Sequence, residues 1–449
     1  MNNFDIIFKT YDVRGIVPNE FDIEYAYKIG RAYPEMLKAK KILVGSDCRL
    51  TSPKIKKAFV SGTLDSGCDV LDLGEIPTPV LYYSIYELDV LAGATITASH
   101  NPKEYNGIKF WWQDKIGLEF NQGLEKLKKF SQKNLSKKST GKLTKINIWP
   151  KYFDFLNSQL KKINLKPLKI VVDAGNGMGG ISIYEFFSKI PELKIIGLNL
   201  KPDGNFPAHL PHPLEEQNIK ELQQKIIENK ADLGIATDGD GDRVVFLDEK
   251  GKDYRGEQIG ALITTNLLEK NPRSKILYDV RSSKSAKEII ESAGGKLILS
   301  KIGHTKMKEK MISENILFGA EMSSHFYFKD SYCTDNADLA IIQILDILSK
   351  NNKTLSKILE PIVKKYYTMR EEKFKVENQE ETITEIENYF KAQGAKIDKF
   401  EGLSVEMPNF WFNIRPSGTE PVIKLNIEAK NKNSALEAEG KIKQIILGL

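Results

Sequence analysis

The chain has 449 residues, of which 41% are hydrophobic and 28% are charged, and its formal net charge at pH 7 is +6. A chain of this length exceeds a single hydrophobic core, so we expect about two to four domains. It contains no apolar run near the roughly 18 residues of a membrane span and no N-terminal signal pattern. Its three scattered cysteines form no CxxC pair, which excludes a disulfide framework and a zinc knuckle. We therefore expect a cytoplasmic protein that has no membrane contact.

Lysines are concentrated between Lys126 and Lys145. A nucleic-acid surface would interleave such lysines with aromatic residues, and this stretch has no regular interleaving and no recognised binding motif. The run therefore predicts a solvated helix face that leads into a linker, and we expect no nucleic-acid partner. A mild positive excess also suits a substrate that carries phosphate.

A strand, a polar turn, a helix and a second strand follow one another three times in the chain. The three units comprise, as strand, helix and strand, residues 41–47, 53–66 and 70–73; residues 169–173, 181–190 and 195–198; and residues 275–279, 285–293 and 297–299. Because the units are spaced by more than about 100 residues, they predict three α/β domains of similar build instead of one large sheet.

The last part of the chain differs in its order of elements. From about Thr368 the pattern predicts an amphipathic helix at 380–393, strands around Val405, at 411–414 and at 422–429, and a closing helix at 434–447. This order is typical of an α+β domain. The predicted domains are therefore three α/β domains over residues 1–148, 149–250 and 251–364, and a smaller α+β domain over residues 365–449.

Three aspartates, Asp238, Asp240 and Asp242, alternate with glycines and precede Arg243. Two like charges about 4 Å apart cost roughly 4 kcal/mol at an effective dielectric near 20, so the carboxylates indicate a bound cation. The glycines let the backbone turn tightly enough to aim the carboxylates at one point. Mg²⁺ prefers such oxygen ligands and is usually completed by a phosphate oxygen. An acidic surface turn is the alternative, because Asp and Gly are ordinary turn residues.

An EF-hand calcium loop is excluded by the residues that follow. Its sixth position must be glycine, and Arg243 stands there. Residues 244–247 are apolar and rich in β-branched side chains, and residues 231–236 precede the loop as another strand pattern. The aspartates therefore lie between two strands, where open α/β sheets tend to bind ligands.

A glycine-rich turn at residues 175–180 formally fits the dinucleotide-binding pattern GxGxxG. That fold also needs an acidic residue at the end of the next strand, and this chain has Asn199 there. We therefore interpret residues 175–180 as a structural turn. The proline-rich loop that follows holds His209 and His212 without a nearby cysteine, so we expect no zinc there.

Ser99 stands just after an apolar strand at residues 92–96, within the segment 97–102. Seven residues past Ser99 begins the segment 106–109, which ends in Lys109. A serine next to a histidine fits a fragment of a hydrolase site, but the segment lacks the GxSxG nucleophile elbow. Taken alone, the segment does not decide between an ordinary loop and a reactive site.

Four segments together resemble the signature set of the α-D-phosphohexomutase superfamily. They are residues 97–102, 238–243, 321–325 and 415–421, one in each predicted domain. The Glu-Met-Ser sequence at 321–323 resembles most the bacterial phosphomannomutase and phosphomannomutase/phosphoglucomutase branch of that family. The resemblance spans the whole chain.

The resemblance implies an architecture and a reaction. The three α/β domains would have mixed sheets, the C-terminal α+β domain would be TBP-like, and all four would surround a central cleft. The enzyme would interconvert mannose 6-phosphate and mannose 1-phosphate, and the corresponding glucose phosphates, through a phosphoserine and a hexose 1,6-bisphosphate. It would use Mg²⁺, with glucose 1,6-bisphosphate or mannose 1,6-bisphosphate as activator. The implied partner is a hexose monophosphate, and the implied assembly is a monomer or a small homo-oligomer.

The resemblance also implies roles for individual residues. Ser99 would carry the phosphoryl group, with Arg14, His100 and Lys109 around it as catalytic residues. The metal ligands would be Ser99, Asp238, Asp240 and Asp242. The substrate-binding residues would be Tyr11, Arg243, Arg281, Lys301, Gly303, His304, Glu321, Ser323, His325, Arg415, Ser417, Gly418 and Thr419.

Some of these roles have alternatives. His304 and His325 also fit structural histidines, and Arg281 stands where family members often have lysine, so its contact can differ. The Ser-Gly-Thr loop at 417–419 is a form shared with phosphoglucosamine mutases, although these usually have glutamine where this chain has Met322. A phosphoglucosamine mutase, a non-catalytic sugar-phosphate-binding homologue and a phosphatase therefore remain alternatives, and the preference between mannose and glucose stays open.

Overall fold

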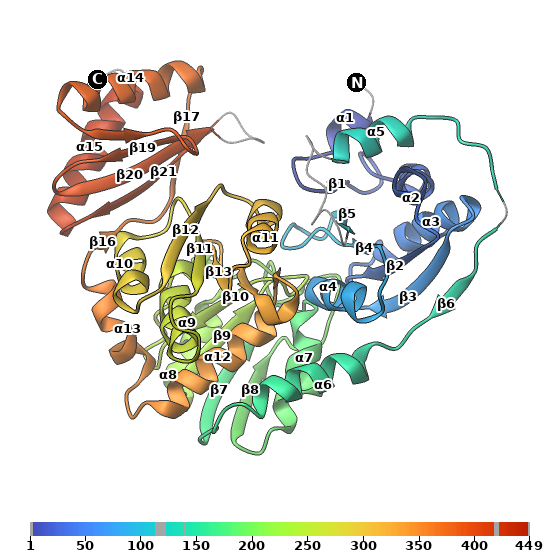
Figure 1. The fold of residues 1–449 in the computed structure, drawn as a ribbon, viewed down its shortest axis with the longest axis horizontal. Helices are drawn as coiled ribbons and strands as arrows, with labels where there is room; N and C mark the ends of the chain where they lie inside the picture. The colour runs from blue at the N-terminus through green and yellow to red at the C-terminus, as the bar shows by residue number, and fades with distance from the viewer. Residues whose placement is uncertain (1–2, 113–122, 139, 417–421, 448–449) are drawn as a thin grey trace.

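The computed structural model describes residues 3–112, 123–138, 140–416 and 422–447 (Figure 1). Four sheets follow one another along the chain, so the fold consists of four consecutive units. In the ribbon the units lie along an arc, with the first unit at one end and the fourth at the other (Figure 1). Within the described residues, no helix is long and apolar enough to cross a membrane.

The first unit has a mixed six-stranded sheet of order β1-β5-β4-β2-β3-β6. Its strands are β1 (Val13–Ile16), β2 (Lys41–Ser46), β3 (Asp69–Glu75), β4 (Ala92–Ile96), β5 (Tyr105–Trp112) and β6 (Leu143–Lys145). Its helices are α1 (Asn3–Ile7), α2 (Ile23–Leu37), α3 (Ser52–Asp65), α4 (Thr78–Glu87) and α5 (Glu125–Ser131). All residues of β4 are buried, as expected for an apolar strand with a neighbour on each side.

The second unit has a four-stranded sheet of order β10-β9-β7-β8, parallel except for the antiparallel edge strand β10. Its strands are β7 (Leu168–Asp173), β8 (Leu193–Leu198), β9 (Leu233–Thr237) and β10 (Val244–Leu247). Its helices are α6 (Trp149–Leu160), α7 (Gly179–Glu185) and α8 (Lys220–Asn229), with short 3₁₀ helices η2 (Phe187–Lys189) and η3 (Glu216–Asn218). The single helix expected at 181–190 is therefore divided at Phe186, and the tighter turn that follows buries Phe187.

The third unit has a five-stranded sheet of order β12-β11-β13-β14-β15, in which the first three strands are parallel. Its strands are β11 (Lys275–Asp279), β12 (Lys296–Ser300), β13 (Phe318–Ala320), β14 (Phe326–Phe328) and β15 (Thr334–Asp335). Its helices are α9 (Gly256–Lys270), α10 (Lys284–Ser292), α11 (His304–Ser313), α12 (Ala337–Lys350) and α13 (Leu355–Val363), with the 3₁₀ helix η4 (Lys329–Ser331).

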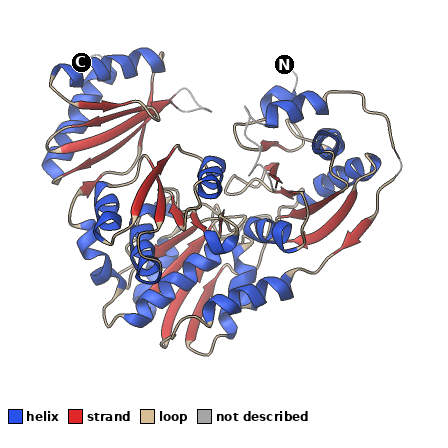
Figure 2. Cartoon of the chain, in the orientation of Figure 1, coloured by secondary structure: helices blue, strands red, loops and turns tan. Residues whose placement is uncertain are grey.

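The fourth unit has an antiparallel sheet of order β16-β21-β20-β19-β18, with β17 also pairing with β21. Its strands are β16 (Tyr367–Thr368), β17 (Glu372–Lys375), β18 (Lys396–Asp398), β19 (Leu403–Glu406), β20 (Phe410–Pro416) and β21 (Val422–Ala429). Helices α14 (Gln379–Ala392) and α15 (Lys432–Leu447) cover this sheet (Figure 2). The predicted fold class, three α/β units with mixed sheets followed by an α+β unit, is confirmed.

The hydrophobic cores divide the chain differently from the sheets. One cluster of buried side chains runs through the first three units and includes Tyr82, Phe246 and Phe318. The fourth unit has a cluster of its own, which includes Phe390 and Ile442. The first three units thus share packing that the fourth does not.

Candidate active site

Ser99 lies in the loop of residues 97–102 that follows β4, here called the Ser99 loop. The residue is only 2% exposed, and its φ of +50° lies in the left-handed region that residues other than glycine rarely adopt. Its amide donates a hydrogen bond to Thr97 Oγ1 at 2.9 Å. Such strain persists only where surrounding contacts hold it, and it is frequent at functional sites.

Arg49, a fully buried residue after β2, holds the Ser99 loop in this conformation. Its guanidinium donates to four backbone carbonyl oxygens, those of Ser99 at 2.8 Å, Asn101 at 2.6 Å, Pro102 at 2.6 Å and Tyr105 at 3.0 Å. Its Nε donates to Asp47 Oδ2 at 3.1 Å, so the buried charge is paired. Hydrogen bonds that involve a charged group are the stronger ones, so Arg49 fixes the backbone around Ser99.

Residues 238–243 form the hairpin loop between the antiparallel strands β9 and β10, here called the aspartate loop. One oxygen each of Asp238, Asp240 and Asp242 lies within 4.8 Å of the other two, and all three residues are buried. Asp238 Oδ1 accepts hydrogen bonds from the amides of Asp242 at 3.1 Å and Arg243 at 3.2 Å. The loop is therefore closed on itself with its carboxylates gathered.

Two glycines let the aspartate loop pack against its neighbours. A Cβ at Gly239 would lie 2.4 Å from the carbonyl oxygen of Ser99, so only glycine allows the two loops to approach this closely. On the other side, a Cβ at Gly177 would lie 2.8 Å from the carbonyl oxygen of Asp238. The glycine turn at 175–180 thus packs against the aspartate loop, which agrees with its interpretation as a structural turn.

The Ser99 loop and the aspartate loop meet at their side chains, although Ser99 and Asp238 are 139 positions apart in the chain. Ser99 Oγ donates to Asp238 Oδ2 at 3.0 Å and lies 3.1 Å from His100 Nδ1. Burial, followed by the charge of Arg243, holds the pKa of His100 well below its usual range. The imidazole is therefore neutral at neutral pH and is placed to exchange a proton with Ser99 Oγ.

Lys109 on β5 lies between two of the three carboxylates. Its ammonium is 2.6 Å from Asp240 Oδ2 and 2.6 Å from Asp242 Oδ2. Burial alone would lower the pKa of Lys109, but the charges of Asp240 and Asp242 outweigh it and raise the pKa above its usual range. Lys109 is therefore charged at neutral pH.

The aspartate loop fits a hard divalent cation. Asp240 Oδ1 is buried and accepts no hydrogen bond from the described residues. Burial, followed by repulsion from Asp242 and Asp240, raises the pKa of Asp238 well above that of an ordinary aspartate, although the charges of Arg243 and Lys109 act in the opposite direction. Three buried carboxylates with one oxygen each gathered within 4.8 Å form an all-oxygen donor set that can bind a metal ion.

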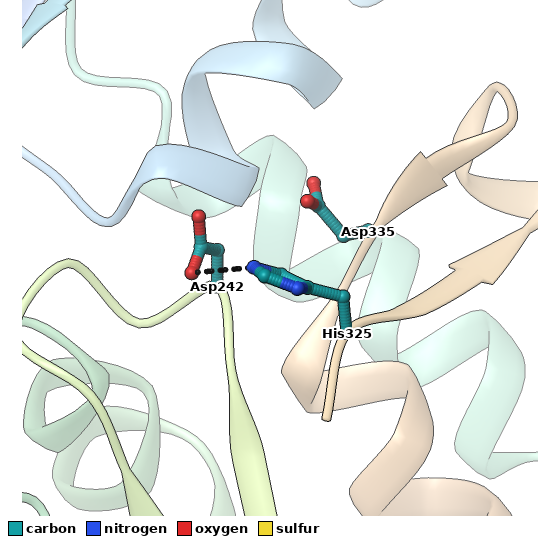
Figure 3. A group of neighbouring side chains, drawn as sticks. All are labelled: Asp242, His325 and Asp335. Atoms are coloured by element: carbon teal, nitrogen blue, oxygen red, sulfur yellow. Dashed lines mark ion pairs between the residues drawn. The ribbon is translucent and has the colours of Figure 1, made fainter. Parts of the chain in front are cut away.

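The loop of residues 321–325 joins β13 to β14 and brings His325 to the aspartate loop. His325 Nε2 lies 3.3 Å from Asp242 Oδ1, the contact drawn as a dashed line in Figure 3, and its Nδ1 lies 3.2 Å from Glu321 Oε2. Burial alone would lower the pKa of His325, but these two carboxylates raise it to about 9. Ser323 Oγ is 3.1 Å from the same Nδ1. The loop therefore presents a charged imidazole between two acids.

Tyr11 links the first unit to the start of α11 in the third. Its hydroxyl donates to the carbonyl oxygen of Ile302 at 3.1 Å, and its ring centroid is 5.6 Å from that of His304. The Gly303 amide donates to Glu321 Oε1 at 3.2 Å. Burial, then Lys308, lowers the pKa of His304 well below its usual range, so this histidine is neutral.

Two arginines, each paired with its own carboxylate, lie where the third unit meets the fourth. Arg281 Nη2 donates to Asp279 Oδ2 at 2.9 Å, and Arg415 Nη2 donates to Glu371 Oε2 at 3.1 Å. Burial would raise the pKa of Glu371, but the charges of Arg415 and Arg281 outweigh it and lower the pKa. The two guanidiniums therefore concentrate positive charge at this boundary.

The structure brings most of the predicted site residues together. Arg14 on β1 joins the Ser99 loop by donating from Nη1 to Asn101 Oδ1 at 2.6 Å, and Arg243 Nε lies 3.8 Å from Asp238 Oδ2. Lys301 is exposed, and its ammonium lies 5.7 Å above the ring centroid of Phe400 in the fourth unit. Ser417, Gly418 and Thr419 lie outside the described residues.

Three residues of the site have no counterpart in the sequence predictions. Arg49 holds the Ser99 loop; Thr78, at the start of α4, donates from Oγ1 to Asp240 Oδ2 at 2.5 Å; and the His212 ring centroid lies 4.4 Å from that of His100. The acid–base pair of Asp47 and Arg49 after a predicted strand was a weak signal. Thr78 and His212 gave none, since their contacts lie more than about 100 positions away along the chain.

The chain matches known proteins over its whole length. Four domain models of phosphoglucomutase/phosphomannomutase match it: α/β/α domain I over residues 5–135, domain II over 150–251, domain III over 255–366 and the C-terminal domain over 371–443. A phosphomannomutase of Escherichia coli strain K12 is 35% identical over 440 residues, which cover 96% of each chain. The chain belongs to the phosphoglucomutase/phosphomannomutase family. It is therefore a hexose-phosphate mutase, an isomerase.

Further members of the phosphoglucomutase/phosphomannomutase family agree. A phosphomannomutase of Methanocaldococcus jannaschii is 36% identical over 452 residues, 99% of this chain and 98% of that one. The structure of a family protein from Burkholderia thailandensis superposes with a TM-score of 0.90 at 28% identity and covers 98% of this chain and 96% of that chain. An N-acetylphosphoglucosamine mutase of Aspergillus fumigatus, solved with GlcNAc-6P and magnesium, covers 82% of this chain and 92% of its own at a TM-score of 0.57 and 15% identity, so it shares the fold alone.

Proposed function

We propose that the chain interconverts mannose 6-phosphate and mannose 1-phosphate, and also the 6- and 1-phosphates of glucose, with Mg²⁺ as its metal ion. The observation that carries the proposal is the 3.0 Å contact between Ser99 Oγ and Asp238 Oδ2 within a group of three buried carboxylates. A serine hydroxyl has no structural need of such surroundings, whereas a serine that accepts and donates a phosphoryl group requires a cation beside it.

In this proposal Ser99 is phosphorylated in the resting enzyme. The phosphoryl group passes from Ser99 Oγ to the free hydroxyl of a hexose monophosphate, which gives a 1,6-bisphosphate and a free serine. The bisphosphate turns over, and its other phosphoryl group returns to Ser99, which leaves the positional isomer as product. Asp238, Asp240, Asp242 and Ser99 would hold Mg²⁺, which when bound supplies positive charge for the transferring group.

The proton of Ser99 Oγ has a neutral acceptor within reach. His100 Nδ1 lies 3.1 Å from Oγ, so it takes the proton when the serine is phosphorylated and returns it when the serine is freed. Lys109 and Arg14 supply fixed positive charge on the same side of the site. Phosphoryl transfer needs little from a protein besides such positioning and charge neutralisation.

The sugar and its second phosphate would be held by the third and fourth units. Glu321 and Ser323 are the residues that would bind ring hydroxyls, which are accessible in both orientations of the intermediate. His325, charged and 3.2 Å from Glu321 Oε2, keeps this acid ionised. Arg281 and Arg415 carry the planar donors that bind phosphate well, and the loop at 417–419 would add hydroxyls and amides.

Coupled initial rates with Mg²⁺ and glucose 1,6-bisphosphate test the substrate. We expect mannose 1-phosphate to react fastest and glucose 1-phosphate to follow within about 100-fold. Fastest turnover of glucosamine 1-phosphate would keep the reaction but assign the chain to phosphoglucosamine mutases. No isomerisation of any of the three would contradict the proposal.

Intact-mass and peptide mass spectrometry test the serine. We expect the isolated enzyme to carry phosphate on Ser99, Ser99→Ala to lose both phosphate and turnover, and Asp240→Asn to lower turnover by at least about 100-fold. Ser158→Ala, an exposed serine on α6, is the matched control and is expected to behave as wild type. Wild-type rates in Ser99→Ala would sink the assignment.

A further inference from the structure

Lys308 on α11 is a fully buried lysine that the proposed reaction does not use. Its ammonium lies 3.0 Å from Asp335 Oδ1 on β15. It also lies 3.7 Å from the ring centroid of Tyr82 and 4.7 Å from that of Trp111. Lysine is almost never fully buried without a partner, and desolvated cations are attracted to the faces of aromatic rings. Lys308 is therefore held by one acid and two rings.

These partners belong to different parts of the molecule. Tyr82 on α4 and Trp111 on β5 come from the first unit, with ring centroids 4.6 Å apart, whereas Lys308 and Asp335 come from the third unit. The contact continues outward, where Tyr86 of α4 stacks on Tyr332 at 4.5 Å and 11°. The Lys308 ammonium thus joins the unit that carries Ser99 to the unit that carries His325.

Asp335 lies close to Asp242 of the aspartate loop and to His325. Oxygens of Asp335 and Asp242 and a ring nitrogen of His325 lie within 4.8 Å of one another, and Figure 3 shows the three side chains grouped together. Among the residues that the structure describes, Asp335 Oδ2 has no hydrogen-bond partner, and Oδ1 faces the Lys308 ammonium at 3.0 Å. The cation beside it is the Lys308 ammonium. Two acids and a histidine at this separation match a metal site in composition, but here the chain supplies the positive charge itself.

We propose that Lys308 is a positioning residue: packed against the rings of Tyr82 and Trp111, it holds Asp335, and the charge of Asp335, within 4.8 Å of a ring nitrogen of His325, helps to keep His325 beside Asp242 and Glu321. This inference rests on the proposed function, in which His325 organises the sugar-binding acid and the aspartate loop. A charge that acts through its neighbours in this way changes the rate of the reaction without touching the substrate. Mutation of a residue that holds a site residue in place typically lowers activity by about 10- to 100-fold, and we expect an effect in that range here.

A double-mutant set separates positioning from simple pairing. We expect Lys308→Met and Asp335→Asn each to lower kcat by about 10- to 100-fold with KM unchanged, and each to lower stability because a buried charge loses its partner. The double variant Lys308→Met with Asp335→Asn has no unpaired charge, so we expect its stability to return towards wild type while kcat stays low. Recovery of kcat together with stability would overturn the proposal, because the pair would then be structural only.

A control and a second readout keep this test independent of turnover. Lys310→Met changes the next lysine of α11, which is partly exposed and whose ammonium donates to the carbonyl oxygen of Leu299 at 2.8 Å instead of contacting Asp335, and we expect wild-type kcat. The ring ¹⁵N signals of His325, one of five histidines in the chain, should shift in Lys308→Met and in the double variant but not in Lys310→Met. Unshifted His325 signals would overturn the positioning role even in a preparation that proved inactive, whereas an inactive wild type with shifted signals would contradict only the proposed function.

Counting bound metal ions tests the alternative that Asp242, His325 and Asp335 form a metal site. If Lys308 supplies the cation beside Asp335, titration of the wild-type enzyme with Mn²⁺ should show one tight site per chain. A second tight site that disappears in Asp335→Asn, with the first retained, would show that Asp242, His325 and Asp335 bind metal, and it would overturn the assignment of Lys308.

Discussion

The boundary between the first and third units differs in kind from the boundary between the third and fourth. The first is built from buried groups, with Lys308 against Tyr82 and Trp111, inside a hydrophobic cluster that three units share. The second consists largely of charged contacts, such as Lys284 Nζ to Glu406 Oε1 at 2.6 Å, and the fourth unit keeps its own core. Partly exposed ion pairs contribute roughly 0–1 kcal/mol each, so the fourth unit is attached more weakly.

The difference separates two tasks. The groups that meet around Ser99 Oγ and the aspartate loop come from the three units with a common core, where packing fixes distances closely. Arg415 of the fourth unit lies across a polar boundary, where it donates to Glu371. Under the proposed function, a rigid chemical centre would thus be combined with a phosphate-binding arginine on a loosely attached unit.

Removal of the fourth unit is the strongest test of this contrast. A chain of residues 1–366 loses Arg415, so we expect turnover to fall by more than about 100-fold. Because the cluster of the first three units stays complete, the thermal midpoint should change by less than about 4 °C. Coupled assays and circular dichroism check the two parts. A truncated chain that fails to fold would show that the fourth unit belongs to the same cooperative structure.

Trp111→Ala should have the next largest effect. The substitution removes a buried ring and one of the two aromatic contacts of Lys308, and we expect the free energy of unfolding to fall by about 3–5 kcal/mol. Trp411→Ala in the fourth unit is the matched control, since this ring is also buried and carries the ammonium of Lys287 at 5.3 Å. Urea unfolding should show a loss confined to the fourth unit in the control. An equal loss of unfolding free energy throughout the molecule in both variants would contradict the idea that the fourth unit is stabilised separately from the first three.

A pH-dependent effect is expected at the boundary of the second and third units. Asp338 on α12 accepts a hydrogen bond from Tyr152 Oη at 2.8 Å, and burial raises the pKa of Asp338 from 3.8 to about 6. A raised carboxyl pKa contributes stability that is complete below pH 4 and is lost as the pH rises through 6. The free energy of unfolding of Asp338→Asn should therefore exceed that of the wild type by up to about 3 kcal/mol above pH 7, with no such gain at pH 4. A gain independent of pH, measured by urea unfolding, would contradict this account.

Lys284→Ala should have the smallest effect. Lys284 pairs with Glu406, and its backbone amide, which the substitution keeps, donates to Glu428 Oε1 at 2.8 Å. We expect the free energy of unfolding to change by less than about 1 kcal/mol, and the difference to shrink in high salt because both groups are partly exposed. A loss as large as that of Trp111→Ala would mean that the fourth unit is held as firmly as the others.

Much of the fold follows from local pattern. The first strands expected at 41–47, 169–173 and 275–279 are β2, β7 and β11, because short β-branched runs that end in polar turns are characteristic of buried parallel strands. The aspartate loop was predictable for the same reason, since its three carboxylates and glycines are adjacent in the chain. The division of the helix at Phe186 was not, because it depends on how Phe187 is buried.

The contacts that hold the site together could not be predicted from the sequence. Arg49 reaches carbonyls that follow it by about 50 positions, and Lys308 meets a ring from the first unit that precedes it by more than 200. A lysine on a helix normally predicts an exposed face, and nothing next to Lys308 indicates a buried cage. Side chains that act across units are therefore seen only when the units are assembled.

Lys109 has a consequence for how the protein matures. The aspartate loop belongs to the second unit, but the ammonium that offsets two of its carboxylates comes from β5 of the first. The repulsion inside the loop is therefore relieved when the two units dock, by a counter-charge encoded in the chain itself. Under the proposed function, we therefore expect Mg²⁺ to be needed for turnover and not for the docking of the two units.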